Sequence, residues 1–188
     1  MKIIVGAGNT KQVGWTALQR SDLDIRSRDN WKRLFKPNSL DAVLGEHILE
    51  HLSFLDGTKA AANVYEFLKQ GGYWRIAVPD ANNPNPNYKD WNSPFGSGQR
   101  LMKLFVYQST EPTHQVFYSL STLSSLLESV GFTVKPLEYY DTNGVFLRRN
   151  WKQTDGKIHR SFNSDYLNQL RIFFNFDNTS LIVDAFKL

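Results

Sequence analysis

Residues 40–52, LDAVLGEHILEHL, and residues 67–80, FLKQGGYWRIAVPD, decide the fold of this chain. The largely apolar runs Leu40–Leu44 and Tyr73–Val78 are typical of strands buried in a parallel sheet. Between them, Thr58–Gln70 has alanines and apolar side chains at helical spacing, and a Gly-Gly pair follows that stops helices. Two buried strands joined by a helix predict a βαβ unit and therefore a mainly parallel sheet.

The same alternation continues in both directions along the chain. Further strands are predicted at Lys2–Val5, Trp15–Leu18, Asp22–Ile25, Phe132–Tyr140 and Leu181–Phe186, and further helices at Asp29–Phe35, His47–Phe54, Gln99–Tyr107 and Ser119–Val130. Because no helix precedes the final strand, we expect it to enter the sheet antiparallel. The prediction is one α/β domain over residues 1–188, a Rossmann-like three-layer sandwich with irregular insertions at about 81–113 and 141–178. In the second insertion, Asp155-Gly156 is typical of a hairpin turn.

The composition restricts the class of protein. Of the 188 residues, 41% are hydrophobic and 21% are charged, as is usual for a soluble globular domain. No apolar run approaches the ~20 residues of a membrane span, and the start, MKIIVGAGN, does not resemble a signal peptide. Cysteine is absent, which excludes disulfides, thiol nucleophiles and thiolate metal sites. These features together favour a cytoplasmic protein.

The net charge of +4 is modest, and it is densest in one stretch near the C-terminus. The basic residues of that stretch are Arg148, Arg149, Lys152, Lys157, His159 and Arg160. They form either a solvated surface hairpin or a collar for an acidic substrate, such as a phosphate or a carboxylate. A nucleic-acid partner is disfavoured, because such proteins usually concentrate more basic charge on one face.

Two segments carry the residues that are candidates for chemistry. Gly6-Ala7-Gly8 follows the first strand, and ligands of open α/β sheets bind beyond the carboxyl ends of strands. The third glycine of the dinucleotide fingerprint would fall at Lys11, which argues against NAD or FAD. Glu46 and His47 follow the strand at 40–44 and would reach the same crevice.

A metal site is not predicted at this point of the chain. His47 and His51 would share one face of the predicted helix, as would Glu46 and Glu50. The zinc motif HExxH nevertheless requires Glu directly after the first His, and here that residue is Ile48. The alternative interpretation is an ordinary helix with its apolar residues turned inward.

Taken together, VGAG at 5–8, LDAVLGEHILEHL at 40–52 and FLKQGGYWRIAVPD at 67–80 resemble the class I S-adenosylmethionine (SAM)-dependent methyltransferases. The LEHL and LKxGG segments carry more of this resemblance than the glycine turn does. Other segments resemble a small bacterial branch of predicted, type 11-like methyltransferases: VGW at 13–15, LDI at 23–25, THQVFYSLSTLSSLLESVGF at 113–132, LEYYDTNGVF at 137–146, GKIHRS at 156–161 and SLIVDAFKL at 180–188. The resemblance implies SAM as cofactor and leaves the methyl acceptor open.

The resemblance also implies which residues contact the cofactor. The implied positions are Gly6, Ala7, Gly8, Gln19, Asp24, Ile25, Glu46, His47 and His51. The glycine turn would pass the methionine part of SAM, and Glu46 and His47 would lie near its sulfonium. The family's ribose-binding acid falls at Gln19, so Asp22 or Asp24 would have to replace it. The first crossover is also short, and the sequence begins at the first strand, so we expect no helix ahead of that strand.

The predicted activity is methyl transfer to an oxygen or nitrogen of a small-molecule acceptor, with His47, His114 or Asp80 as the base. One alternative is a methyltransferase-fold protein without catalysis that acts as a binding or assembly subunit. Another is an RNA or DNA methyltransferase, although Val78-Pro79-Asp80-Ala81 stands where base-methylating enzymes carry Asp/Asn-Pro-Pro-Tyr/Phe. A homodimer is compatible with all three.

Overall fold

The computed structural model describes residues 1–105, 113–162, 164 and 179–188. Its centre is a seven-stranded sheet with strand order β2-β1-β3-β4-β7-β5-β6. The strands are β1 (Lys2–Val5), β2 (Trp15–Leu18), β3 (Leu40–Glu46), β4 (Leu68–Pro79), β5 (Thr133–Tyr140), β6 (Phe146–Arg148) and β7 (Ser180–Phe186). The pairs among β2, β1, β3 and β4 are parallel, and β7 runs antiparallel to both β4 and β5. The predicted α/β class and the antiparallel last strand are therefore confirmed.

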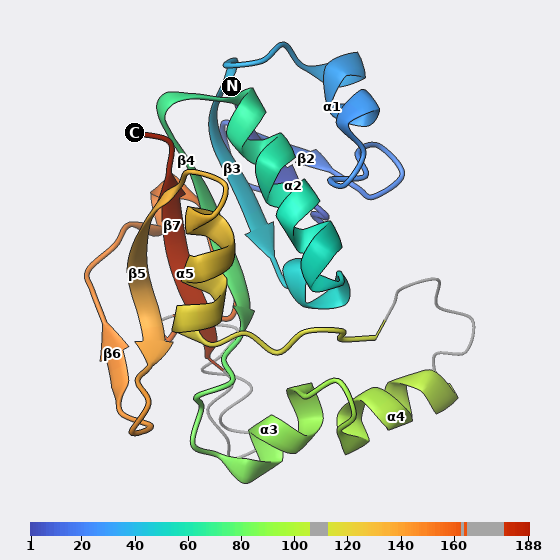
Figure 1. The fold of residues 1–188 in the computed structure, drawn as a ribbon, viewed down its shortest axis with the longest axis vertical. Helices are drawn as coiled ribbons and strands as arrows, with labels where there is room; N and C mark the ends of the chain where they lie inside the picture. The colour runs from blue at the N-terminus through green and yellow to red at the C-terminus, as the bar shows by residue number, and fades with distance from the viewer. Residues whose placement is uncertain (106–112, 163, 165–178) are drawn as a thin grey trace.

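Helices cover one face of this sheet. The helices are α1 (Arg28–Leu34), α2 (Phe54–Phe67), α3 (Pro86–Asn92), α4 (Ser97–Phe105) and α5 (Leu120–Glu128), with short 3-10 turns η1 (Leu49–His51) and η2 (Gln153–Asp155). Figure 1 shows α2 and α5 in front of the sheet, and α3 and α4 beyond the end of β4. None of the described helices is both long and apolar enough to cross a membrane.

The larger core lies between the sheet and these helices. Trp31 of α1, Val64 and Phe67 of α2, and Leu123 of α5 pack there against inward strand residues such as Val43. The helices α1, α2 and α5 begin where serines cap them: the side chains of Ser27, Ser53 and Ser119 each accept a bond from a first-turn backbone N–H. The inward side chains of the strands and the apolar faces of these helices therefore form one apolar layer.

The opposite face of the sheet is covered by irregular chain, residues 149–162, which we call the covering segment. Its Ile158 and Trp151 pack against Ile4, Leu44 and Ile182, the side chains that alternate away from the helices. Among the described residues, no helix takes part in this second core. In the part of the chain that the structure describes, this side of the sheet is covered by loop, and the connection between β1 and β2 consists of turns and irregular chain.

Buried polar groups hold the covering segment to the sheet. The Arg75 guanidinium forms a two-pronged ion pair with Asp184, at 2.7 and 2.8 Å, and also donates to the carbonyls of Lys152 and Gly156. Trp151 donates its indole N–H to the carboxylate of the buried Glu138. Burial raises the pKa of Glu138, and hydrogen bonds to its carboxylate, including the one from Trp151, only partly oppose that effect.

Several local predictions were wrong. The helix expected at His47–Phe54 is only the single turn η1, because His47 adopts a left-handed φ of 55° that breaks a helix. The next helix, α2, begins and ends earlier than expected, so the glycine pair lies within β4, where Gly71 has a φ of 78°. Asp22–Ile25 forms turns, and Asp155-Gly156 belongs to η2 and its end.

Candidate active site

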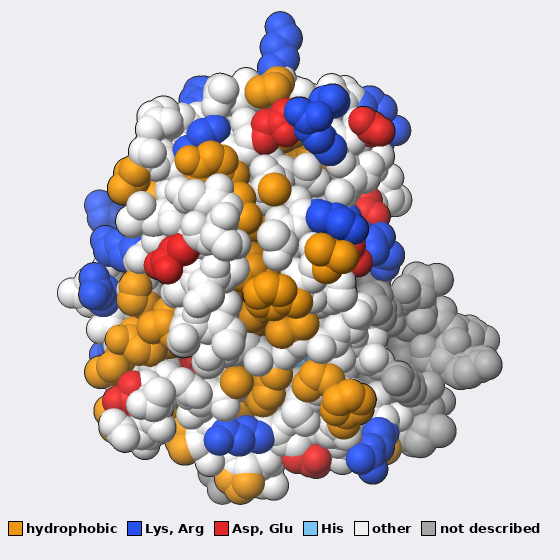
Figure 2. All heavy atoms as spheres, in the orientation of Figure 1, with side chains coloured by type: hydrophobic (Ala, Val, Ile, Leu, Met, Phe, Trp, Pro, Cys, Tyr) orange, Lys and Arg blue, Asp and Glu red, His pale blue; other side chains and the backbone are white. Residues whose placement is uncertain are grey.

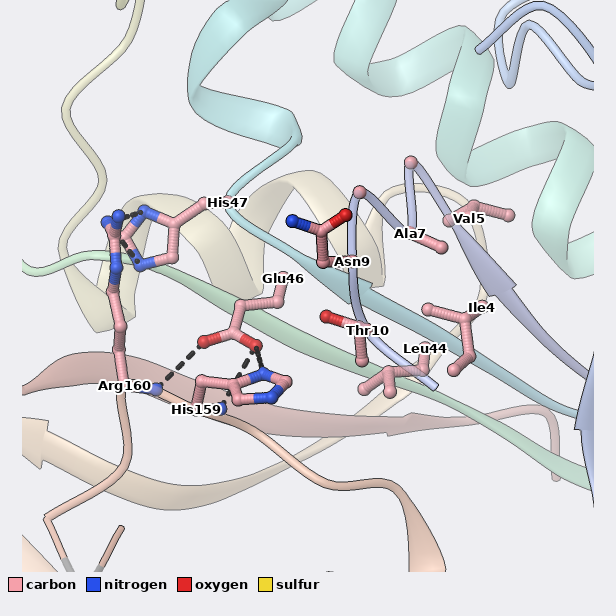
Figure 3. A pocket seen from close by; sticks show the side chains of 12 residues that line it. Ile4, Val5, Ala7, Asn9, Thr10, Leu44, Glu46, His47, His159 and Arg160 are labelled. Carbon is pink, nitrogen blue, oxygen red and sulfur yellow. Dashed lines mark hydrogen bonds and ion pairs between the residues drawn. The ribbon is translucent and has the colours of Figure 1, made fainter. Parts of the chain in front are cut away.

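A cavity of about 470 Å³ opens at the carboxyl edge of the parallel strands. Val5 of β1 pairs with Gly45 of β3, so the turn after β1 and the end of β3 lie next to each other. Figure 3 shows the result: residues 6–10 form one wall, and Glu46, His47, His159 and Arg160 form the other. The structure thus brings five of the predicted cofactor residues together, namely Gly6, Ala7, Gly8, Glu46 and His47.

The glycine turn has a conformation that needs glycine. Gly6 and Gly8 have φ values of 56° and 51°, in the left-handed region. A Cβ on Gly6 would lie 2.9 Å from Cδ1 of Ile48, whereas a Cβ on Gly8 would meet nothing within 4 Å. The turn therefore packs tightly against the chain after β3 on one side and is open at Gly8.

Four predicted cofactor residues, Gln19, Asp24, Ile25 and His51, do not line the cavity. The Gln19 amide bonds the turn itself: its Nε2 donates to the Gly8 carbonyl at 2.8 Å, and its Oε1 accepts from the Gly8 N–H at 3.1 Å. Asp24 forms a two-pronged ion pair with Arg26, which holds the pKa of Asp24 below its ordinary value. Ile25 is buried in the core, and its carbonyl accepts bonds from Trp31 and Asn63.

Glu46 joins the cavity wall to the covering segment. Its carboxylate accepts the backbone N–H groups of His159 at 3.0 Å and Arg160 at 2.8 Å, and lies 3.2 Å from Nδ1 of His159. Burial alone would raise the pKa of Glu46, but these bonds and the nearby His47 hold it below its ordinary value. A charged Glu46 therefore places His159 and Arg160 at the cavity.

Gln12 makes a second connection across the same gap. Its side chain donates to the Thr154 carbonyl at 2.8 Å and accepts from the Lys157 N–H at 2.7 Å. The loop after β1 and the covering segment are thus joined directly. Sequence reasoning missed Gln12, because a single glutamine in a polar loop carries no signal of its partner more than 140 residues away.

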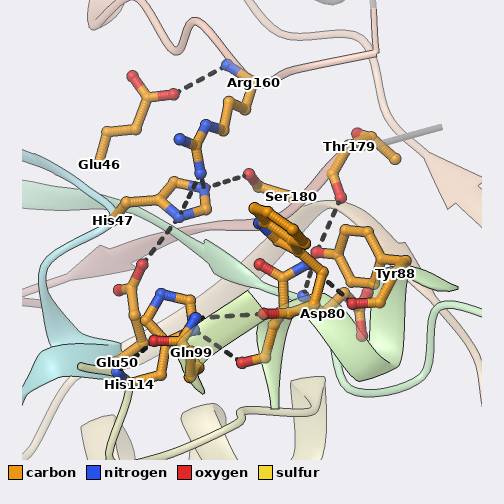
Figure 4. A network of polar contacts seen from close by, with 12 residues as sticks. Glu46, His47, Glu50, Asp80, Tyr88, Gln99, His114, Arg160, Thr179 and Ser180 are labelled. Atoms are coloured by element: carbon orange, nitrogen blue, oxygen red, sulfur yellow. Dashed lines mark hydrogen bonds and ion pairs between the residues drawn. The ribbon is translucent and has the colours of Figure 1, made fainter. Parts of the chain in front are cut away.

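His47 is the most constrained side chain of the site. Its Nε2 lies 2.8 Å from Oγ of Ser180, its Nδ1 lies 2.8 Å from a carboxylate oxygen of Glu50, and the Arg160 guanidinium lies 3.0 Å from Nδ1. Burial, followed by Arg160, lowers the pKa of His47, so the ring is neutral near pH 7. The Glu50 carboxylate beside Nδ1 can only accept a hydrogen bond and the Arg160 guanidinium can only donate one, so the ring lies between an acceptor and a donor, with its Nε2 toward Ser180. Figure 4 shows this arrangement.

Behind His47 lies a cluster that draws on distant parts of the sequence. Glu50 is 0% exposed, and ligand atoms of Glu50, His51 and His114 all lie within 4.8 Å of one another. Gln115 donates its backbone N–H to the Glu50 carbonyl at 2.6 Å and its side-chain amide to the His51 carbonyl at 2.8 Å. Glu50 was not among the predicted site residues, because its burial depends on contacts that the sequence does not reveal.

Asp80 is fully buried at the end of β4. Its carboxylate accepts the backbone N–H groups of Tyr140 at 2.7 Å and Asn82 at 2.9 Å, and its own N–H donates to the Tyr88 hydroxyl. Burial raises the pKa of Asp80 to about 6, against the opposing effect of these bonds. The carboxylate thus joins the ends of β4 and β5, and it does not line the cavity.

Of the basic stretch, only His159 and Arg160 line the cavity. The Arg148 guanidinium lies 4.8 Å from the ring centre of Phe162, on the outer strand β6. On the face that Figure 2 shows, the coloured Lys and Arg side chains are scattered among acidic and apolar ones. The described residues of that face therefore form no single basic patch of the kind that nucleic acids require.

No known protein-family model matches this sequence, and no curated protein matches it. Solved structures resemble it over nearly its whole length. A SAM-dependent methyltransferase from Archaeoglobus fulgidus aligns with a TM-score of 0.51 and 15% identity, over 99% of this chain and 85% of the other. A SAM-dependent methyltransferase from Thermotoga maritima aligns with a TM-score of 0.50 and 15% identity, over 100% of this chain and 73% of the other.

A third similar structure is a chain from the complex of the Haloferax volcanii Trm112 methyltransferase activator with a protein described as a methyltransferase. Its TM-score is 0.51 at 12% identity, over 99% of this chain and 81% of the other. At such identities the likeness concerns the fold. The chain therefore has the fold of the class I SAM-dependent methyltransferases, as the sequence motifs predicted.

Proposed function

We propose that this protein is a SAM-dependent methyltransferase that acts on an oxygen or nitrogen of a small acceptor. The observation that carries the proposal is the cavity where the glycine turn after β1 meets Glu46 and His47 after β3. In open α/β folds, ligands bind at this edge, beyond the carboxyl ends of the strands. A volume of about 470 Å³ lies within the range of sites for cofactors and small ligands.

The residues of the cavity fit the amino-acid end of SAM. That end carries an ammonium and a carboxylate, and the cavity wall presents a carboxylate, Glu46, and a guanidinium, Arg160. Glu46 uses part of its accepting capacity on the covering segment, and a carboxylate has about four lone-pair sites in all. The open backbone at Gly8 allows close approach of a ligand. When bound, the cofactor supplies an electrophilic methyl group.

His47 is our choice for the base. Its Nε2 faces the Ser180 hydroxyl at 2.8 Å and would accept the proton that the acceptor loses. The Glu50 carboxylate beside Nδ1 would fix the ring and stabilise the imidazolium that forms. The left-handed backbone of His47 agrees with this role, because strained residues cluster at functional sites.

Calorimetry with SAM and with S-adenosylhomocysteine tests the proposal. Gly8→Val adds a branched side chain to the cavity wall, and Gly71→Val is its matched control. Both glycines have a positive φ and nothing within 4 Å of a built Cβ, but only Gly8 lines the cavity. Each variant should lose a similar ~1–2 kcal/mol of stability.

We expect Gly71→Val to bind each nucleoside as tightly as the wild type does. Gly8→Val should bind each of them at least about tenfold more weakly, which is a loss of ~1.4 kcal/mol in binding free energy. Equal affinities in the two variants would place the ligand elsewhere. If neither nucleoside produces heat with the wild type, the protein is not the proposed enzyme.

One observation favours a second candidate, a methyltransferase-fold binding or assembly protein without catalysis. The Gln19 amide stands where the family pattern has its ribose-binding acid, and both of its polar atoms are bonded to the Gly8 backbone. The described residues therefore provide no free acid for the ribose hydroxyls at this position. The same calorimetry tests the first function against the second, since a chain that binds neither nucleoside cannot be the enzyme.

A further inference from the structure

We propose that Glu50, His51 and His114 bind a divalent transition-metal ion, with Zn²⁺ as the representative. Two imidazoles and one carboxylate form a ligand set that suits zinc and its neighbours in the first transition row. The binding itself does not depend on the proposed methyl transfer; only a role for the ion in that reaction rests on it.

The buried carboxylate is the first argument. Glu50 is 0% exposed, and neither of its carboxylate oxygens has a hydrogen bond of good geometry among the described residues. One oxygen lies 2.8 Å from Nδ1 of His47, a contact at ion-pair distance. The second oxygen remains without such a contact. Buried charges are normally paired, hydrogen-bonded or bound to metal, so this carboxylate needs a further partner.

His114 is oriented as a metal-binding histidine is. Its Nδ1 lies 2.7 Å from the carbonyl oxygen of Asn92, and a carbonyl can only accept, so the proton resides on Nδ1. The lone pair of the ring is then on Nε2. Metal-binding histidines usually donate their other ring N–H to a carbonyl or carboxylate in this way. The His114 backbone N–H is held in turn by the Gln99 side chain, at 3.0 Å.

The geometry of the cluster allows one ion. The His51 and His114 rings lie edge to face with their centres 4.9 Å apart, and the three ligand atoms lie within 4.8 Å of one another. Ligand atoms on a tetrahedral zinc ion lie about 3.3 Å apart, since each bond is ~2.0–2.1 Å long. The side chains would therefore draw together by at most about 1.5 Å, which small rotations of the partly buried His51 and His114 side chains can supply.

Three protein ligands leave at least one position of the ion open. Structural zinc sites are closed by four protein ligands, whereas sites that bind water or substrate keep such a position. The cluster lies behind His47, on the side of the ring that faces Glu50 (Figure 4). An ion here would thus lie on the Nδ1 side of His47, the residue that we assign as the base, and its open position would bind a water or a substrate oxygen and lower the pKa of the bound group.

The experiment is a titration of chelator-treated, untagged protein with ZnCl₂ by calorimetry, followed by Mg²⁺ as a comparison. We expect one tight Zn²⁺ site per chain and much weaker binding of Mg²⁺, which prefers oxygen ligands. His114→Gln and Glu50→Gln should each weaken Zn²⁺ binding by more than about 100-fold, since loss of an outer partner alone costs ~10–100-fold. The control is His159→Gln, a histidine outside the cluster, which should change the affinity less than threefold.

Unfolding by urea without metal checks that each variant is folded. Should both cluster variants fail to fold, a zinc-edge anomalous difference map of wild-type crystals provides the answer: a peak between the three side chains supports the site, and its absence overturns the proposal. Unchanged Zn²⁺ affinity in folded His114→Gln would overturn it equally. Because SAM binding is measured separately, with and without zinc, failure of the metal site and failure of the methyltransferase proposal give different results.

Discussion

The substitution Glu46→Gln tests how the covering segment is held at the cavity. In the wild type, the Glu46 carboxylate accepts the backbone N–H groups of His159 and Arg160 at 3.0 and 2.8 Å. A glutamine keeps one acceptor oxygen and turns an NH₂ group, itself a donor, toward the other N–H. Because hydrogen bonds to charged groups contribute ~1.5–3 kcal/mol, the free energy of unfolding should fall by about that amount.

The loss should depend on pH in a defined direction. The pKa of Glu46 in the folded protein is below its ordinary value of 4.5, so the carboxylate stabilises the fold fully above pH 4.5. That stabilisation disappears as the pH falls through the lowered pKa. The stability difference between wild type and Glu46→Gln should therefore be large at pH 7 and narrow below pH 4.5.

Urea unfolding at several pH values measures this difference, and amide exchange at His159 and Arg160 reports the local opening. The control is Asp56→Asn, which removes a partly exposed carboxylate that pairs with Lys59 and should have a clearly smaller effect. If Glu46→Gln unfolds at the wild-type urea concentration, or if the difference does not narrow in acid, Glu46 does not hold the covering segment as described.

Two further predictions concern the ion pair of the second core and the base. Arg75→Met leaves Asp184 charged and buried, so the free energy of unfolding, measured with urea, should fall by about 3–5 kcal/mol. Adding Asp184→Leu should restore most of that stability. A fall no larger than that of a surface variant would contradict this prediction. His47→Asn removes the base but keeps a residue that tolerates the left-handed backbone. If this variant still binds SAM, it should form S-adenosylhomocysteine at least about 100-fold more slowly than the wild type, with any acceptor that the wild type methylates. A rate equal to that of the wild type would assign the base to another residue.

The sequence predicted the sheet better than it predicted the site. Strands such as Leu40–Glu46 and Ser180–Phe186 are mostly apolar because both faces are covered, and that pattern is local. The expected helix after residue 46 failed because one left-handed residue, His47, interrupts it, and histidine gives no signal of such a backbone. β6 is only three residues long and was missed.

The site residues that were missed share a physical cause. Gln12, Glu50 and Ser180 have roles that depend on partners far away in the sequence, which for Glu50 is His114, and no periodicity reports such contacts. The resemblance identified the cavity wall at residues 6–8 and 46–47 because those residues belong to local motifs. The resemblance also indicated Gln19, which lies beside the glycine turn. Its side chain donates a hydrogen bond to the backbone of that turn and does not line the cavity.

His47 lies between the two proposed sites, and its backbone conformation explains why no helix begins directly after β3. A helix beginning at residue 47 would carry His47 and His51 on one face, four residues apart. The left-handed φ of His47 breaks this arrangement, so that the His47 ring meets Ser180 and Arg160 at the cavity while Glu50 and His51 turn toward His114. The left-handed backbone at one residue thus separates a histidine that lines the cavity from the cluster of Glu50, His51 and His114, and the Glu50 carboxylate lies against both.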